Sequence, residues 1–481
     1  FIAGVGGVDM AVLNRIAEDV AALKLEHAGP SGDHVTYSVF YKQLLNFGVH
    51  ELNADVVPNR DAVFAAETYS AHTVESKLVA AMTPLLQQVL CAGTRNIILS
   101  NTEEIKWIEA GGDATNFQKP DLVMMLDGLQ VPHDPTGNAD VKSYRSELPQ
   151  SQFDYKFGAP PYEARAFISG IIEYKVKGLD STAKGELAAY LKHLSSKNDP
   201  NTYVGLLCDR DSYALTSCLR GRLADFQLGS WSDHGSASVL QRHFDRKNLW
   251  LELLLGVCEK MRVRLCPEDN RSAFLGRGGY GTVFRVKSLD SEEVFALKIV
   301  LYRQSDTKCS VIKVMLSHEH AQLRTLGGTC TCCVSVVHAE PTAVLDEYGD
   351  ELGAGYLMSE VGQQIVGADC FYGHALSALG SSVFTALQRL HACGHAHGDA
   401  RIANIVRVGE SVKWIDMMVS VSGSAAAKRV HDIKTLLTSL FPTNALAVTG
   451  LMKSNVVSTY SDDCSELNMT SICTAVAAVV W

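Results

Sequence analysis

The stretch HGDARIANIV occupies residues 397–406, and KWIDMM follows at residues 413–418. Within the first stretch, Asn404 comes five residues after Asp399. The second stretch places Asp416 directly after apolar residues, as expected at the end of a short strand. A carboxylate that accepts a proton, followed by an amide and a carboxylate that bind Mg²⁺, is a donor set suited to phosphoryl transfer. The spacing therefore predicts a phosphotransferase site in the second half of the chain.

A glycine-rich stretch, FLGRGGYGTVFRV, lies upstream of this site at residues 274–286. Its glycines have G-x-G-x-x-G spacing, and glycine lets main-chain N–H groups approach phosphate oxygens closely. The valine that follows them is placed to cover an adenine ring. The predicted nucleotide-binding residues of this stretch are Gly276, Gly278, Gly281 and Val283.

Lys298 lies inside the apolar run VFALKIV, 22 positions after the first of these glycines. A lysine is costly to bury unless it meets an anion, and phosphate is the anion expected here. Glu319, in SHEHAQLRTL, is predicted to lie on a helix and to pair with Lys298. We expect ATP as the nucleotide and Mg²⁺ as its metal. Asn404 and Asp416 would be the metal ligands, and Asp399 would orient the attacking hydroxyl.

The order of glycine loop, lysine, helical glutamate, HxDxxxxN and apolar-Asp resembles the protein-kinase-like fold. The resemblance covers residues 268–481 and implies two lobes, the second one short. Gly398 stands where most protein kinases have an arginine, and no A-P-E motif follows Asp416. Asp432, from a following helix, is expected to anchor the catalytic loop. In these departures the chain resembles small atypical kinases and aminoglycoside-type phosphotransferases. The resemblance implies that the phosphoacceptor is either a Ser or Thr of a protein or a small molecule.

The first half of the chain contains a second candidate site. QKPD ends at Asp121, and IIEYKVK contains Glu173 and Lys175, which project from one face of a strand because they are two residues apart. Two carboxylates can hold Mg²⁺, and a lysine beside them can position or activate water, as in phosphodiester hydrolysis. Glu75, on a predicted helix, is a further candidate ligand, with a solvent-facing charge as its alternative role. A competing D-x-K pair in SQFDYKFG lies in a stretch that indicates a loop.

Apolar periodicity predicts a compact α/β domain at residues 61–240, after an N-terminal segment at residues 1–60. This domain resembles the restriction-endonuclease-like (PD-(D/E)xK) core, and residues 241–267 are expected to form one linking helix. The predicted fold class is thus an α/β domain plus an α+β bilobal kinase-like domain. The elements expected in the first domain are a helix at 65–90, strands at 96–100, 119–128 and 165–178, a helix at 181–197 and a hairpin at 202–218.

The pairing of the two domains resembles the Crinkler family of secreted effectors from oomycetes and some fungi. The resemblance implies a role in virulence, secretion, and entry into a host cell and its nucleus, with DNA as a partner of the first domain. The chain begins with Phe1, so we expect a fragment that a targeting segment could precede. Two alternatives stay open: a DNA nuclease regulated by its kinase-like half, and a non-catalytic, nucleotide-sensing binding protein.

Composition sets the outer limits of these predictions. The 481 residues are 47% hydrophobic and 20% charged, which is typical of a soluble globular protein of two domains. A net charge of −10 argues against coating nucleic acid through bulk charge, and no apolar run is long enough to span a membrane. The 13 cysteines are scattered except for CTCC at residues 330–333. We expect most of them to be reduced core thiols of an intracellular protein, with a zinc site at CTCC as the alternative.

Overall fold

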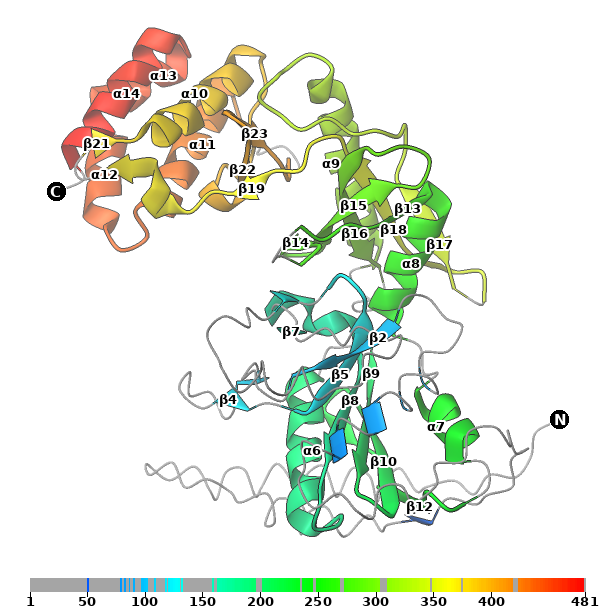
Figure 1. The fold of residues 1–481 in the computed structure, drawn as a ribbon. Coiled ribbons are helices and arrows are strands. Elements are labelled where there is room, and N and C mark those ends of the chain that lie inside the picture. Colours follow the sequence, from blue (N-terminus) through cyan, green and yellow to red (C-terminus); the bar gives the residue numbers. More distant parts are fainter. Residues whose placement is uncertain are drawn as a thin grey trace.

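The computed structural model forms a mixed α/β protein in which two large sheets and a helical C-terminal part follow one another along the chain (Figure 1). This confirms the predicted fold class at the level of mixed α/β structure. None of the helices in the described ranges is both long and apolar enough to cross a membrane. The structure describes residues 50–51, 78–79, 82–83, 86, 90, 97–102, 108–109, 117–118, 120–129, 131–132, 158–159, 162–195, 201–233, 236–244, 248–268, 272–302, 309–346, 348–372, 375–417 and 423–479.

The first sheet has the strand order β2-β5-β8-β9-β10-β12-β1, with β11 paired to β10. Neighbours β2, β5 and β8 are antiparallel, whereas β8 and β9 are parallel and are joined through helix α6. A helical crossover is the usual connection between parallel neighbours. The elements are β1 His50–Glu51, β2 Ile97–Asn101, β5 Leu122–Leu126, β8 Ile168–Tyr174, α6 Ser181–Leu194, β9 Thr202–Cys208, β10 Ser212–Leu219, β11 Arg222–Leu223 and β12 Gln227–Ser230.

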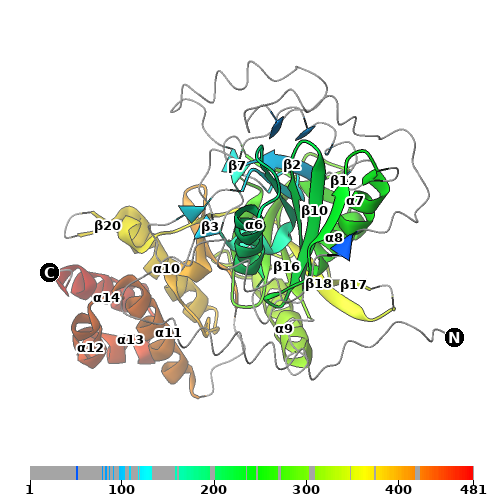
Figure 2. The same cartoon turned by 90° about the horizontal axis from the view of Figure 1, so that it is seen from below.

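Both faces of the first sheet are covered. Val123 and Ile171 pack with α6, whereas Leu122 and Ile172 pack on the other face with α7 (Ser236–Phe244). Figure 2 shows α6 and α7 on opposite sides of the strands. Because both faces are buried, nearly every residue of β5, β8, β9 and β10 is buried, and β5 is apolar throughout. The described helical residues of the predicted helix at 65–90, among them Leu78, Val79, Met82 and Leu86, join the α7 side of the core.

The predicted linking helix is wrong, because the segment forms two helices. α7 ends at Phe244, and α8 spans Leu249–Met261. The side chain of Asn248 caps α8 by accepting a hydrogen bond from the amide of Leu251 at 3.1 Å. Asparagine is a favoured N-cap, and this signal marked the start of a new helix within the apolar pattern.

The second large sheet is antiparallel throughout, in the order β13-β15-β16-β18-β17, with β14 paired to β15. Helix α9 packs on one face with Val300, and α8 packs on the other with Leu297 and Ile299. Gly353 permits the close approach of α8, since an added Cβ there would lie 2.8 Å from a methyl carbon of Leu253. The elements are β13 Val263–Leu265, β14 Phe274–Arg277, β15 Thr282–Ser288, β16 Val294–Leu301, α9 Cys309–Gly327, β17 Thr342–Leu345 and β18 Glu351–Met358.

One hydrophobic core runs from the α6 side of the first sheet to the α8 side of the second. Phe167 from the first part packs edge-on against Phe284 of β15, with ring centroids 5.0 Å apart. The carbonyl of Gly128, just after β5, accepts a hydrogen bond from Ala273 at 2.7 Å, just before β14. The first sheet is therefore joined directly to the strand pair that carries the glycine-rich turn.

The C-terminal part is mostly helical, and Figure 1 shows its helices grouped beyond a small sheet of β19, β22 and β23. Further two-stranded pairs are β3–β4, β6–β7 and β20–β21. The remaining elements are β3 Ile108–Glu109, β4 Phe117–Gln118, β6 Val131–Pro132, β7 Gly158–Ala159, η2 Tyr162–Phe167, β19 Gln363–Gln364, η3 Gly367–Cys370, β20 Phe371–Tyr372, β21 Ala375–Leu376, α10 Ala378–Ala392, η4 Ile402–Asn404, β22 Ile405–Val408, β23 Ser411–Trp414, α11 Ala425–Leu440, α12 Ala445–Lys453, α13 Asn455–Asp462 and α14 Glu466–Val479.

Candidate active site

Lys298 lies in the middle of β16 with a side chain only 2% exposed. Its Nζ donates to both carboxylate oxygens of Glu319 on α9, at 2.8 and 3.0 Å, and also to Asp416. Burial lowers the pKa of Lys298, but the two carboxylates outweigh it and raise that pKa well above its usual value. The predicted pairing of Lys298 with Glu319 is present, and the site holds a buried ammonium group that two carboxylates stabilise.

Glu319 also accepts hydrogen bonds from two tyrosines. Tyr356 lies opposite Lys298 in the β16–β18 register and donates at 2.6 Å. Tyr280, from the glycine-rich turn, donates to the same carboxylate, and its ring centroid lies 4.7 Å from Nζ of Lys298. Neither tyrosine was predicted as a site residue. Tyr280 could have been predicted from the sequence, because it lies within the glycine-rich turn.

The glycine-rich turn between β14 and β15 lies over these charged groups. An added Cβ at Gly281 would come within 3.0 Å of Cε of Lys298, and one at Gly278 would lie 3.5 Å from Asp416. At Gly276 an added Cβ would meet nothing within 4 Å, so the structure gives no steric reason for glycine there. Val283 lies opposite Lys298 in the β15–β16 register, hence on the same face of the sheet.

Asp399 and Asn404 are brought together by the short helix η4. The side-chain amide of Asn404 donates to the backbone carbonyl and to Oδ2 of Asp399, both at 2.9 Å. Arg401, which was not among the predicted site residues, donates to the two carboxylate oxygens of Asp399 at 2.7 and 2.6 Å. The position of Arg401, two residues after Asp399, could have predicted this ion pair from the sequence.

The loop before Asp399 is anchored from α11, as predicted. The Asp432 carboxylate accepts hydrogen bonds from the backbone amides of His397 at 2.7 Å and Gly398 at 2.9 Å. His391 lies 3.0 Å from the same carboxylate. Gly398 has a φ of 83°, a left-handed conformation that glycine adopts without strain. This backbone conformation gives a physical reason for glycine in HGD.

Asp416 follows β23 and has a φ of 56°, which is unusual for a residue with a side chain. Burial raises the pKa of Asp416, but Lys298 outweighs burial and the net shift is downward, so the carboxylate is ionised at neutral pH. The buried ring of His397 links Asp399 to the residue before Asp416: its Nδ1 accepts a hydrogen bond from the amide of Asp399 at 3.2 Å, and its Nε2 lies 2.8 Å from the carbonyl of Ile415. The structure thus gathers Lys298, Asp399 and Asp416 in one region.

The second candidate site lies on the α6 face of the first sheet. Leu122 pairs with Ile172, so Asp121 and Glu173 are the next opposed residues of these antiparallel strands. Oδ2 of Asp121 accepts a hydrogen bond from the amide of Tyr174 at 2.7 Å, and Glu173 accepts one from the amide of Asp121 at 3.3 Å. The 52 residues between Asp121 and Glu173 therefore do not prevent the two from meeting.

Lys175 points toward Glu173, with Nζ 2.7 Å from its carboxylate, and lies 3.2 Å from Glu186 of α6. Burial raises the pKa of Glu173 to about 8, against the opposing effect of Lys175. Glu186 was not predicted as a site residue, because its contact with Lys175 depends on how α6 packs on the sheet. Glu75 lies outside the described residues, as does the competing D-x-K pair.

No known protein family matches the sequence, and no curated protein is significantly similar to it. The kinase-like, nuclease-like and Crinkler resemblances therefore stay predictions, and the two clusters of charged side chains carry the functional argument.

Proposed function

We propose that the protein is an ATP- and Mg²⁺-dependent phosphotransferase with a bilobal, protein-kinase-like second half. The observation that carries this proposal is the position of Lys298 between Glu319 and Asp416, beneath a glycine-rich turn. A buried ammonium group held by two carboxylates is expensive to build as a purely structural feature. Its charge and its place beside backbone N–H groups suit the phosphates of a nucleotide.

The roles of the remaining residues follow from their chemistry. Asp416 is ionised, and Asn404 uses its amide nitrogen in two bonds to Asp399, which leaves its amide oxygen for a cation. These two oxygen donors fit Mg²⁺, which would supply neutralisation of phosphate charge when bound. Asp399 would accept or orient the proton of the acceptor hydroxyl. Arg401 holds the Asp399 carboxylate in place from the other side.

The acceptor is proposed to be a Ser or Thr of a protein, with a small-molecule hydroxyl as the second class. The test incubates the full chain with γ-labelled ATP and Mg²⁺, alone and with a general protein substrate or an aminoglycoside. Transfer by the wild type that is lost in Asp399→Asn supports the proposal. Absence of ATP binding by calorimetry in the presence of Mg²⁺ would contradict it.

A second proposed activity is Mg²⁺-dependent cleavage of DNA by the first half. It is favoured by the opposed carboxylates of Asp121 and Glu173 with Lys175 on the same face. We expect the full chain to nick plasmid DNA with Mg²⁺, and both Asp121→Asn and Lys175→Met to lose this activity. Lys177→Met is the matched control, since that lysine is exposed two residues further on. Cleavage that survives Asp121→Asn would point to a contaminating nuclease.

The combination of these two sites supports the proposal that the chain is a Crinkler-type effector, secreted and then active in a host nucleus. The competing proposal is a nucleotide-sensing binding protein, which would bind ATP without transferring phosphate. A fluorescently tagged full chain expressed in plant cells should accumulate in the nucleus. Exclusion of the tagged chain from the nucleus would contradict the effector proposal without bearing on ATP chemistry.

A further inference from the structure

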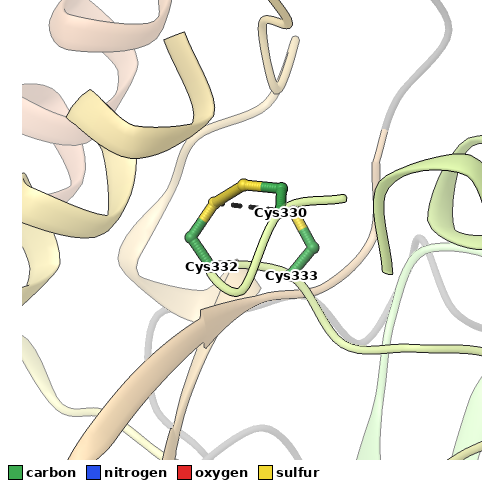
Figure 3. Close-up of side chains that lie close together, drawn as sticks. All are labelled: Cys330, Cys332 and Cys333. Atoms are coloured by element: carbon green, nitrogen blue, oxygen red, sulfur yellow. Dashed lines mark hydrogen bonds between the residues drawn. A yellow bond between two sulfur atoms is a disulfide. The ribbon is translucent and has the colours of Figure 1, made fainter. Parts of the chain in front are cut away.

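Three cysteines converge on the turn that follows α9, and none of them belongs to either site described above. The Sγ atoms of Cys330, Cys332 and Cys333 lie within 4.8 Å of one another, and all three side chains are buried (Figure 3). Cys330 and Cys332 form a disulfide, whereas the other described cysteines are free, as predicted for most of the cysteines. Within the described ranges, no other cluster of His, Cys, Asp or Glu brings three such donor atoms together.

The backbone holds this turn independently of the disulfide. The amide of Cys330 donates to the carbonyl of Leu326, near the end of α9, at 2.6 Å. The amide of Trp414, on β23, donates to the carbonyl of Cys332 at 2.7 Å, and the amide of Val334 donates back to Trp414 at 3.2 Å. The backbone of the turn is thus fixed between α9 and β23 by contacts that do not involve the disulfide.

We propose that the reduced form of this cluster binds one soft metal ion, Cu⁺ or Zn²⁺, through the sulfurs of Cys330, Cys332 and Cys333. Thiolates are the ligands that select these ions. A metal–sulfur distance of about 2.3 Å places three sulfurs around one ion about 4 Å apart. The Sγ atoms of Cys332 and Cys333 are already 4.0 Å apart.

The two ions differ in the number of donors they need. Cu⁺ is satisfied by three thiolates, whereas Zn²⁺ in a structural site takes four ligands. Within the described residues, no other Cys, His, Asp or Glu donor joins the three sulfurs, so a bound Zn²⁺ would take water as its fourth ligand and Cu⁺ would need none.

Disulfide formation and metal binding exclude each other, because Cys330 and Cys332 cannot be bonded together and also serve as two thiolates. A phosphine reductant with one water converts the disulfide into two thiols and becomes a phosphine oxide. The ion then replaces the three thiol protons, which are released to solvent. Bound metal would brace the turn itself, which main-chain hydrogen bonds fix between α9 and β23. The proposal does not depend on phosphotransfer.

The experiment uses the full chain, reduced with a phosphine without oxygen, desalted, and incubated with Zn²⁺ or Cu⁺. We expect one ion per chain by mass spectrometry and sulfur neighbours at about 2.3 Å by X-ray absorption. Cys332→Ser should lose this ion, and the matched control Cys473→Ser, outside the cluster, should keep it. Metal content in the wild type no higher than in Cys332→Ser would overturn the proposal.

A second measurement covers the case in which Cys332→Ser does not fold. Bound metal should protect residues 330–333 of the wild type from alkylation, read out by peptide mass spectrometry. Alkylation that is equally fast with and without either ion would overturn the proposal, whatever the variants do. Binding of Cu⁺ but not Zn²⁺ by the wild type supports the three-sulfur copper form.

Discussion

Tyr280 donates its hydroxyl to Glu319, the same carboxylate that holds Lys298. The tyrosine belongs to the glycine-rich turn, and its ring lies beside the lysine ammonium group, 4.7 Å from Nζ. Burial is the main cause that raises the pKa of Tyr280, so its hydroxyl is protonated and able to donate at neutral pH. The turn is therefore closed onto the lysine, and phosphates that approach Lys298 must displace this contact.

The first prediction is that Tyr280→Phe binds ATP more tightly. Nucleotide binding breaks the hydrogen bond from Tyr280 to Glu319 in the wild type, at a cost of about 1 kcal/mol. The variant has no such bond to break, so its Kd for ATP should be about fivefold lower. Calorimetry with Mg²⁺ present measures the effect. Tyr356→Phe is the matched control, because it removes a hydroxyl from the same carboxylate without touching the turn. An unchanged or higher Kd in Tyr280→Phe would show that the contact does not oppose nucleotide binding.

The second prediction concerns stability at Lys298. Lys298→Ala leaves Glu319, only 1% exposed, without its cation, and such a loss typically costs about 3–5 kcal/mol. The neutral pair Lys298→Met with Glu319→Gln should recover much of this loss, since it keeps an acceptor for the tyrosines. Urea unfolding measures stability, and both variants should be inactive in phosphotransfer. If Lys298→Ala were as stable as the wild type, the ion pair would not be a buried, coupled unit.

Asp399→Asn is predicted to separate catalysis from nucleotide binding. Loss of a proton acceptor typically lowers kcat by about 10²–10⁴-fold. The Kd for ATP should stay unchanged, because Lys298 and Asp416 lie on other elements and keep their contacts. Asp369→Asn is the control, an exposed aspartate on η3. An equal loss of ATP affinity would assign Asp399 to binding instead of proton transfer.

The sequence predicted those site residues whose position follows from local periodicity. Glu173 and Lys175 share a strand face because they are two residues apart, and Lys298 was marked by its charge within an apolar strand. The anchoring of the loop by Asp432 also followed from the order of the elements. In each case a short-range pattern or a single costly burial identified the residue.

Contacts between distant elements could not be predicted in the same way. Glu186 reaches Lys175 only because α6 packs across the sheet, and the direction of Tyr280 depends on how the glycine-rich turn folds. The break before α8 was hidden by a continuous apolar pattern, although Asn248 is a favoured cap.

The last prediction concerns pH and Glu173. Burial, opposed by Lys175, raises its pKa from the usual value of 4.5 to about 8 in the folded protein. Between these two values the folded chain holds a proton that the unfolded chain has lost. Unfolding therefore releases a proton, and the stability contributed by this group falls as pH rises through that window, by up to about 1.4 kcal/mol per pH unit.

Glu173→Gln isolates this effect, because the glutamine cannot titrate while all other groups remain. In urea unfolding with a metal chelator, we expect the wild type to lose stability relative to Glu173→Gln as pH rises from about 5 to about 8. Mg²⁺ should reverse the loss in the wild type alone, since metal binding favours the deprotonated carboxylate. A stability difference that stays constant across the range would mean that Glu173 is ionised throughout. The α6 face of the sheet would then carry a charged structural ion pair with Lys175 instead of a proton-regulated metal ligand.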